Sequence, residues 1–135
     1  MAFGETILNM TGTICTELTR RQLDDGAPLV TFSVISNERR FDKQTGGWVD
    51  GRKFSVRVKC WRRLADNVAV SLGIGDQVLV AGRLRSTEYE EDGRTRYGLE
   101  LDAFAVGPNL KNAIAQVRKV RGGGSVDADA EAAAA

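Results

Sequence analysis

Apolar and polar residues alternate along five segments of the chain, which is the pattern of β-strands with one buried face. In the first segment Leu8, Met10 and Ile14 fall on one side, and Gly12 indicates a bulge or a close approach of another strand. The five strands are expected at residues 6–15, 29–36, 54–61, 78–91 and 95–106. The inward positions predicted for the later strands are Phe32, Val34, Phe54, Val56, Val58, Cys60, Val78, Val80, Leu84, Leu99 and Leu101.

The period changes between the third and fourth strands. Leu64, Val68 and Leu72 recur every four residues, which predicts a helix with one apolar stripe, ended by Gly73 or Gly75. Three strands, a helix and then a hairpin is the order of the OB-fold, a small barrel that often binds oligonucleotides or oligosaccharides. We therefore expect an all-β, five-stranded OB-fold barrel with one helix between its third and fourth strands.

The segments between the strands are expected to be turns and loops. DDGAP at 24–28 and DGR at 92–94 predict tight turns, the second of them in a hairpin. Residues 37–53 form a long polar connection, and a loop of that length in a small domain is often functional. Residues 110–120 are compatible with a short terminal helix. The expected division is a binding domain at 1–110, an extension at 111–121 and a disordered low-complexity tail at 122–135.

The composition is that of a soluble protein and offers little for catalysis. Apolar residues make up 42% and charged residues 27%, and no apolar run is long enough to span a membrane. There is no histidine, and Cys15 and Cys60, which we expect to be reduced, cannot form a structural zinc site alone. No phosphate-binding loop or nucleophile-elbow motif occurs. The sequence therefore predicts no enzyme, no metal and no cofactor, and the absence of a signal peptide predicts a cytoplasmic protein.

The outward face of the third strand combines cations with a large aromatic ring. Arg57, Lys59 and Trp61 alternate with the inward residues. This mixture suits single-stranded nucleic acid, whose phosphates attract cations and whose bases stack on rings. Two other segments repeat the mixture, and residues 20–63 contain 11 cations against 5 acids. The candidate binding residues are Arg39, Arg40, Phe41, Trp48, Arg57, Lys59, Trp61, Arg83, Arg85 and Tyr89.

Each of these residues also has a purely structural interpretation. Trp61 could close one end of the barrel, and the two loop aromatics could pack the loop onto it. The arginines of the fourth strand could pair with Glu88, Glu90 and Glu91, and the same acids around Tyr89 would repel phosphate. The agreement of three separate segments favours a nucleic-acid surface over these alternatives.

Several ordered motifs resemble the bacterial single-stranded DNA-binding protein family, SSB. They are ILNMTGTI, ERRFDKQTGGW, VKCWRRLADNVAVSLGIGDQVLVAGRLR, DGRTRY and LELDAFAVGPNL, and together they cover nearly all of residues 5–115. The resemblance implies an OB-fold, a homotetramer, and sequence-nonspecific binding and protection of single-stranded DNA in replication, recombination and repair.

The resemblance also implies binding positions. In the family an aromatic residue just before D-K-x-T-G commonly stacks on bases; here the region reads Arg39-Arg40-Phe41, so an arginine stands at that position beside Phe41. Ser55 belongs to the binding face but falls where many members carry tryptophan, so one stacking platform is absent. Tyr89 matches the aromatic that follows G-x-L-R. Fewer rings imply weaker binding than in the family's strongest members.

The end of the chain departs from the family's pattern. Members that recruit other enzymes end in acids followed by an apolar tip with proline and phenylalanine, whereas this chain ends DADAEAAAA. We therefore expect a paralogue without the recruiting tip. The main hypothesis is a single-stranded DNA coat. The alternatives are a protein-interaction barrel, such as a primosomal accessory subunit, and a nucleic-acid enzyme, for which the acids at 90–92 in a predicted turn give little support.

Overall fold

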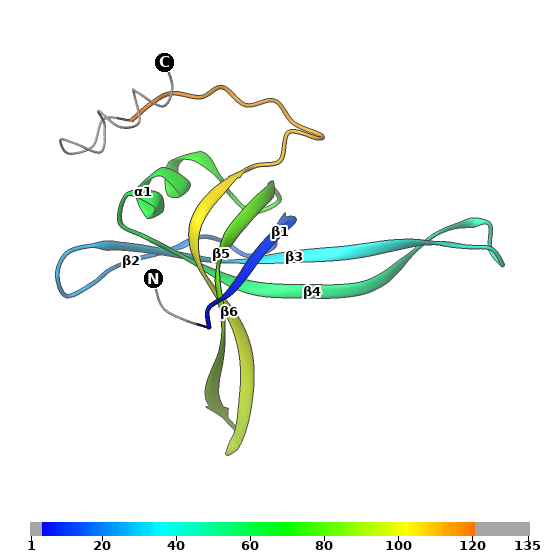
Figure 1. Cartoon of the computed structure of the whole chain (residues 1–135), viewed down its shortest axis with the longest axis horizontal. Helices are drawn as coiled ribbons and strands as arrows, with labels where there is room; N and C mark the ends of the chain where they lie inside the picture. Colours follow the sequence, from blue (N-terminus) through cyan, green and yellow to red (C-terminus); the bar gives the residue numbers. More distant parts are fainter. Residues whose placement is uncertain (1–3, 121–135) are drawn as a thin grey trace.

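Within residues 4–120, which the computed structural model describes, the chain forms six strands and one helix (Figure 1). In chain order these are β1 (Thr6–Ile14), β2 (Thr19–Gln22), β3 (Pro28–Asp42), β4 (Gly47–Trp61), α1 (Arg62–Ser71), β5 (Gln77–Glu91) and β6 (Arg94–Pro108). The five alternating segments are strands and the four-residue period is a helix, so these predictions are confirmed. The additional strand, β2, has four exposed residues and no alternation that would have indicated it.

Five of the strands close a ring. β1 pairs with β5 along most of its length and with β3 at Thr13 and Ile14, and the order runs β1-β5-β6-β4-β3 and back to β1. β4 and β6 run parallel, whereas the other neighbours in the ring are antiparallel. β2 adds to the outer edge of β3. The ring, with its helix between β4 and β5, is the five-stranded OB-fold barrel that the sequence predicts.

The core lies inside the ring, at the positions that the alternation predicts. Val34, Val56 and Val58 are buried, and α1 packs Ala65 and Val68 against the same cluster. One predicted inward position is wrong, because Leu99 is 37% exposed. It lies just beyond the stretch of β6 that pairs with β4, where the strand has left the ring.

Both cysteines are free thiols. Cys15 is exposed and Cys60 is buried in the core. Burial raises the pKa of the Cys60 thiol to about 12, because the charged thiolate would lose its hydration. Cys60 therefore stays a neutral, apolar core residue at physiological pH.

Two glycines allow strands to approach closely. A Cβ on Gly12 would lie 2.6 Å from the carbonyl oxygen of Ile35, and a Cβ on Gly82 would overlap the carbonyl oxygen of Asp102. No larger residue fits at either place without moving a strand. The close approach predicted at Gly12 is confirmed, and Gly82 accompanies a register shift between β5 and β6.

Residues 37–53 are not a loop, as the sequence predicts, but a long hairpin arm in which β3 and β4 continue beyond the barrel (Figure 1). Neither face of the arm packs on the core, so the alternation that reveals a half-buried strand is absent. Its turn is set locally. The Asp42 carboxylate accepts a hydrogen bond from the N–H of Gln44 at 3.0 Å, and Gly46 adopts a positive φ of 72°.

β5 and β6 form a second arm, which leaves the barrel in a different direction (Figure 1). Asp92 and Gly93 have φ values of 52° and 74°, the two positive values of a type I′ turn. The hairpin predicted from DGR is therefore confirmed.

The segment after β6 does not form the predicted terminal helix. Residues 110–120 turn once and then run extended. A helix this short needs a surface to pack on, and Ile114 and Val117 are each more than nine-tenths exposed. The tail at 122–135, predicted to be disordered, lies outside the described residues. No helix in the described part of the chain is long and apolar enough to cross a membrane.

Candidate nucleic-acid interface

The candidate interface begins on the outer face of β3 and β4, the face opposite the core. Side chains alternate across a strand, and cross-strand partners share a face. The odd-numbered residues of β3 therefore lie on the outer face together with their partners on β4. These pairs are Leu29–Trp61, Thr31–Lys59, Ser33–Arg57, Ile35–Ser55, Asn37–Lys53, Arg39–Asp50 and Phe41–Trp48.

A register shift between Asn37 and Arg39 keeps this face continuous along the arm. On the barrel side of the shift the β4 residues on the outer face are odd-numbered, and beyond it they are the even-numbered Asp50 and Trp48. β4 thus carries one more residue than β3 at this point, as at a β-bulge. Counting by twos along β4 alone would place Trp48 on the side away from Lys59, so the shift brings Trp48 onto the outer face.

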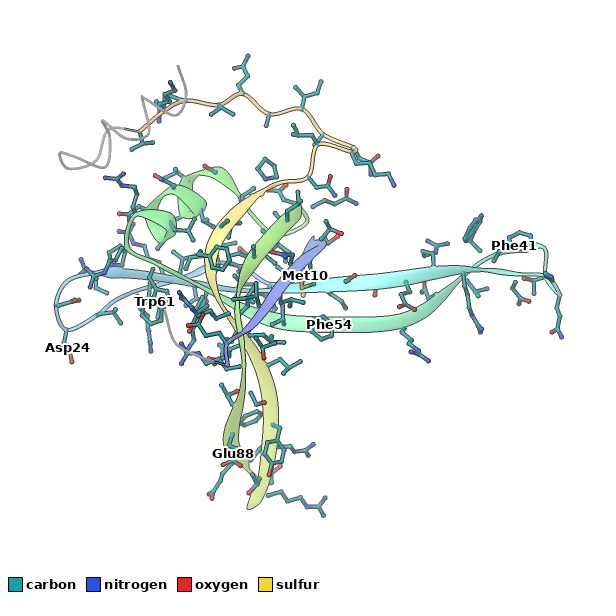
Figure 2. The ribbon with its side chains drawn as sticks, viewed as in Figure 1. Met10, Asp24, Phe41, Phe54, Trp61 and Glu88 are labelled. Carbon is teal, nitrogen blue, oxygen red and sulfur yellow. The ribbon has the colours of Figure 1, made fainter. Side chains whose placement is uncertain are left out.

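Phe41 and Trp48 form an aromatic pair near the end of the arm (Figure 2). Their ring centroids are 5.7 Å apart and their planes meet at 73°, an edge-to-face contact. The residues are 53% and 64% exposed. The two rings pack on each other and not on the barrel, and both present surface to solvent.

Trp61 lies at the opposite end of the face, where β4 meets α1. It is 37% exposed. Its cross-strand neighbour Leu29 is buried but stands outside the main core cluster. Trp61 is therefore positioned to cover Leu29 with one part of its ring and to offer the remainder to solvent, which combines the two interpretations that the sequence left open.

Arg39 and Arg40 lie on opposite sides of the arm. Arg39 is on the outer face, with its Nε 3.7 Å from Asp50 Oδ1. Arg40 pairs with Val49 on the other side, so it is not brought together with the remaining candidate residues. Phe41 returns to the outer face.

The outer face continues from β4 onto β6 and β5. The parallel β4–β6 pairing and the antiparallel β5–β6 pairing place two acids of β6 between cations of both neighbouring strands. Four predicted binding residues therefore surround two carboxylates. The two rungs are Arg57–Glu100–Arg85 and Lys59–Asp102–Arg83.

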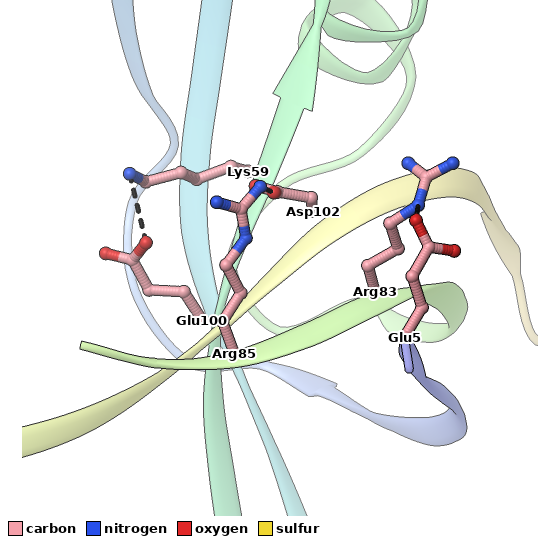
Figure 3. A network of polar contacts seen from close by, with 6 residues as sticks. All are labelled: Glu5, Lys59, Arg83, Arg85, Glu100 and Asp102. Carbon is pink, nitrogen blue, oxygen red and sulfur yellow. Dashed lines mark hydrogen bonds and ion pairs between the residues drawn. The ribbon is translucent and has the colours of Figure 1, made fainter. Parts of the chain in front are cut away.

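Two of these cations form diagonal ion pairs across the rungs (Figure 3). Lys59 Nζ lies 3.1 Å from Glu100 Oε2. Arg85 pairs through its terminal guanidinium nitrogen with Asp102. Sequence reasoning did not include Glu100 and Asp102 in the face, although their alternation with Leu101 places them outward.

The remaining two cations differ in their surroundings. Arg83 Nε donates a hydrogen bond to the Glu5 carboxylate at 2.9 Å. Arg57 has no ion-pair partner within residues 4–120. The interpretation that pairs the β5 arginines with the acids at 88–91 is therefore wrong in its partners, because these arginines bind carboxylates beside the barrel.

Tyr89 extends the outer face onto the second arm. It has the same strand parity as Arg83 and Arg85, and it is about half exposed. Its ring lies over Gly98, since a Cβ there would be 3.7 Å from Tyr89 Cε1. Arg96 is its cross-strand partner, so the acids on either side of Tyr89 are accompanied by a cation.

A family model described as the single-strand binding protein family matches residues 6–108, from the first strand to the last. The chain belongs to this family. Among its single-strand binding relatives, the single-stranded DNA-binding protein of Mycobacterium tuberculosis is 37% identical over 123 residues, 90% of this chain and 75% of the relative. Single-stranded DNA-binding protein 2 of Streptomyces coelicolor is 39% identical over 122 residues, 90% of this chain but 61% of the relative.

Solved structures of single-strand binding proteins agree with the fold. The small single-stranded DNA-binding protein of Streptomyces coelicolor superposes with a TM-score of 0.75 at 32% identity, covering 82% of this chain and all of that one. The second single-stranded DNA-binding protein of Mycobacterium smegmatis gives a TM-score of 0.69 at 37% identity, covering 85% of this chain and 99% of that one. The family resemblance read from the motifs is confirmed.

Proposed function

We propose that the chain binds single-stranded DNA without sequence preference and protects it in replication, recombination and repair, with no catalytic step. Its relatives are named for single-stranded DNA binding. The observation that carries the proposal is the continuity of the outer face, on which Phe41 and Trp48 share a side with Arg57 and Lys59.

The outer face would bind a strand by two kinds of contact. Bases stack on exposed rings, each worth about 1–3 kcal/mol, and phosphates contact cations. Trp48 and Trp61 lie at the two ends of β4, which at about 3.3 Å per residue places them about 40 Å apart along the strand. A track of this length suits several successive nucleotides and not a single base. We infer that the binding residues are those of the sequence prediction, with Arg40 the weakest member.

We further propose that the binding unit is residues 1–110, that residues 111–121 are an extension, and that the protein works as a homotetramer in the cytoplasm, at the nucleoid. Self-association is supported by the unpaired edge of β1, since its pairing with β3 is limited to Thr13 and Ile14 within the described chain. Recruitment of other replication proteins through the tail is not part of the proposal.

Tryptophan fluorescence tests the function directly, because the only two tryptophans, Trp48 and Trp61, are both on the outer face. We expect oligo-dT to quench the emission to saturation, with affinity falling log-linearly as salt rises. Duplex DNA and RNA of equal length are the comparisons. The Trp61→Phe variant leaves Trp48 as the single fluorophore and reports on the arm alone. No quenching by oligo-dT at low salt would refute the proposal and favour a protein-docking barrel.

A further inference from the structure

Two carboxylates lie in the middle of the cationic outer face. Glu100 and Asp102 come from β6, which runs between β4 and β5, and each is flanked by a cation from both neighbouring strands. A surface that binds only by attracting phosphate has no use for acids at its centre, since like charges repel.

The acids are held more firmly than the cations they bind. The side chains of Glu100 and Asp102 are 19% and 14% exposed, whereas that of Arg85 is 64% exposed. An arginine or lysine side chain can swing its charged end toward a new partner while its stem stays on the surface. When a phosphate arrives, the cations are therefore the members that change partner, and the carboxylates stay in place.

This exchange leaves the carboxylates beside the bound strand. Lys59 and Arg85 exchange one oxyanion for another, so the contact adds less than an unpaired cation would add. Each vacated carboxylate also repels the phosphate that displaced it. Arg57, which has no ion-pair partner within residues 4–120, makes its phosphate contact without this loss.

We propose that Glu100 and Asp102 are affinity-limiting residues, which compete with DNA phosphates for Lys59 and Arg85 and so keep binding weak enough for rapid release. The inference rests on the proposed function, because it assumes that a single strand occupies the outer face. It predicts that the isosteric amides bind more tightly than the native acids.

The test is a titration of native protein, Glu100→Gln, Asp102→Asn and the double variant with oligo-dT at several salt concentrations. We expect each single change to tighten binding about two- to fivefold at low salt. We expect the slope of log affinity against log salt to steepen by about 0.7 for each carboxylate removed. Thermal unfolding of each variant confirms that the barrel is intact.

Glu90→Gln is the matched control. It removes the same formal charge from the same pair of strands, but Glu90 lies opposite Thr95 on the arm and forms no ion pair within the described residues. It should leave affinity and slope almost unchanged. An equal effect of Glu90→Gln would show that only net charge matters and would overturn the inference.

The remaining outcomes separate the inference from the function on which it rests. Native protein that binds oligo-dT, with amide variants that bind equally or more weakly, overturns the role of Glu100 and Asp102 and leaves the proposed function standing. Native protein that does not bind oligo-dT at low salt overturns both.

Discussion

Trp48 and Trp61 occupy the same face of one strand but have different neighbours. Trp48 contacts Phe41 on an arm that reaches solvent on both sides, whereas Trp61 lies opposite the buried Leu29 at the barrel. Strand parity alone gives the two rings similar roles in stacking. The structure separates them, because emptying a half-buried site affects folding and emptying an exposed site does not.

We therefore expect Trp48→Ala to weaken oligo-dT binding by about 1–3 kcal/mol while the unfolding midpoint holds. Trp61→Ala should weaken binding and also lower the free energy of unfolding, by less than the roughly 3–5 kcal/mol of a fully buried aromatic site. The sequence alone predicts almost no stability loss for Trp61, since it places the whole ring outside. Both quantities come from one titration and one urea unfolding curve on each variant. Equal stability losses for the two variants would contradict the distinction.

At the scale of elements, the β3–β4 arm separates binding from folding. No residue between Val34 and Val56 is buried, so the arm adds nothing to the core. Asn37 and Lys53 are still paired at its base. The arm can therefore be shortened there without disturbing the strands of the ring.

Replacing residues 38–52 by Asn-Gly should close a two-residue hairpin between Asn37 and Lys53. We expect a thermal midpoint close to that of the native protein and a loss of oligo-dT affinity of at least about 1–3 kcal/mol, because both tip rings are gone. The deleted segment holds four cations and three acids, so the salt slope should change little. The variant Phe41→Ala/Trp48→Ala keeps the arm and removes only the rings, and it should show most of the same loss. Undiminished affinity after the shortening would exclude the arm from the interface.

The same arm shows where sequence reasoning stops. Alternation reveals a strand only when one face is buried, so the barrel strands are predictable and residues 37–53, polar on both faces, read as a loop. β2 is missed for the same reason. The side on which Trp48 lies depends on a register shift, and the pairing of Lys59 with Glu100 depends on the parallel contact of β4 with β6. Neither follows from a local period, because both join residues far apart in the chain.

At the scale of the whole molecule, the barrel leaves one edge and one apolar surface uncovered. β1 pairs with β5 from Thr6 onward, but its other edge meets β3 only at its last residues within the described chain. Ile7, Leu79 and Phe104 are each about half exposed on β1, β5 and β6. An unpaired strand edge beside exposed apolar residues is typical of a surface that associates with another copy of the same chain.

We therefore expect a homotetramer, in which β1 edges pair between copies and the apolar surface near Leu79 packs against a second pair. Leu79→Asp should lower the assembly state, since a charge in an apolar contact is left without its hydration. Each barrel should stay folded, because Leu79 lies outside the core and its neighbours Val78 and Val80 form the buried side of β5. Light scattering coupled to size exclusion at micromolar concentration gives both masses, and circular dichroism gives the fold. Lys111→Asp, on the exposed extension, is the control for added negative charge. A monomer mass for the native chain would refute the assembly, and a tetramer of Leu79→Asp would move the second contact away from this surface.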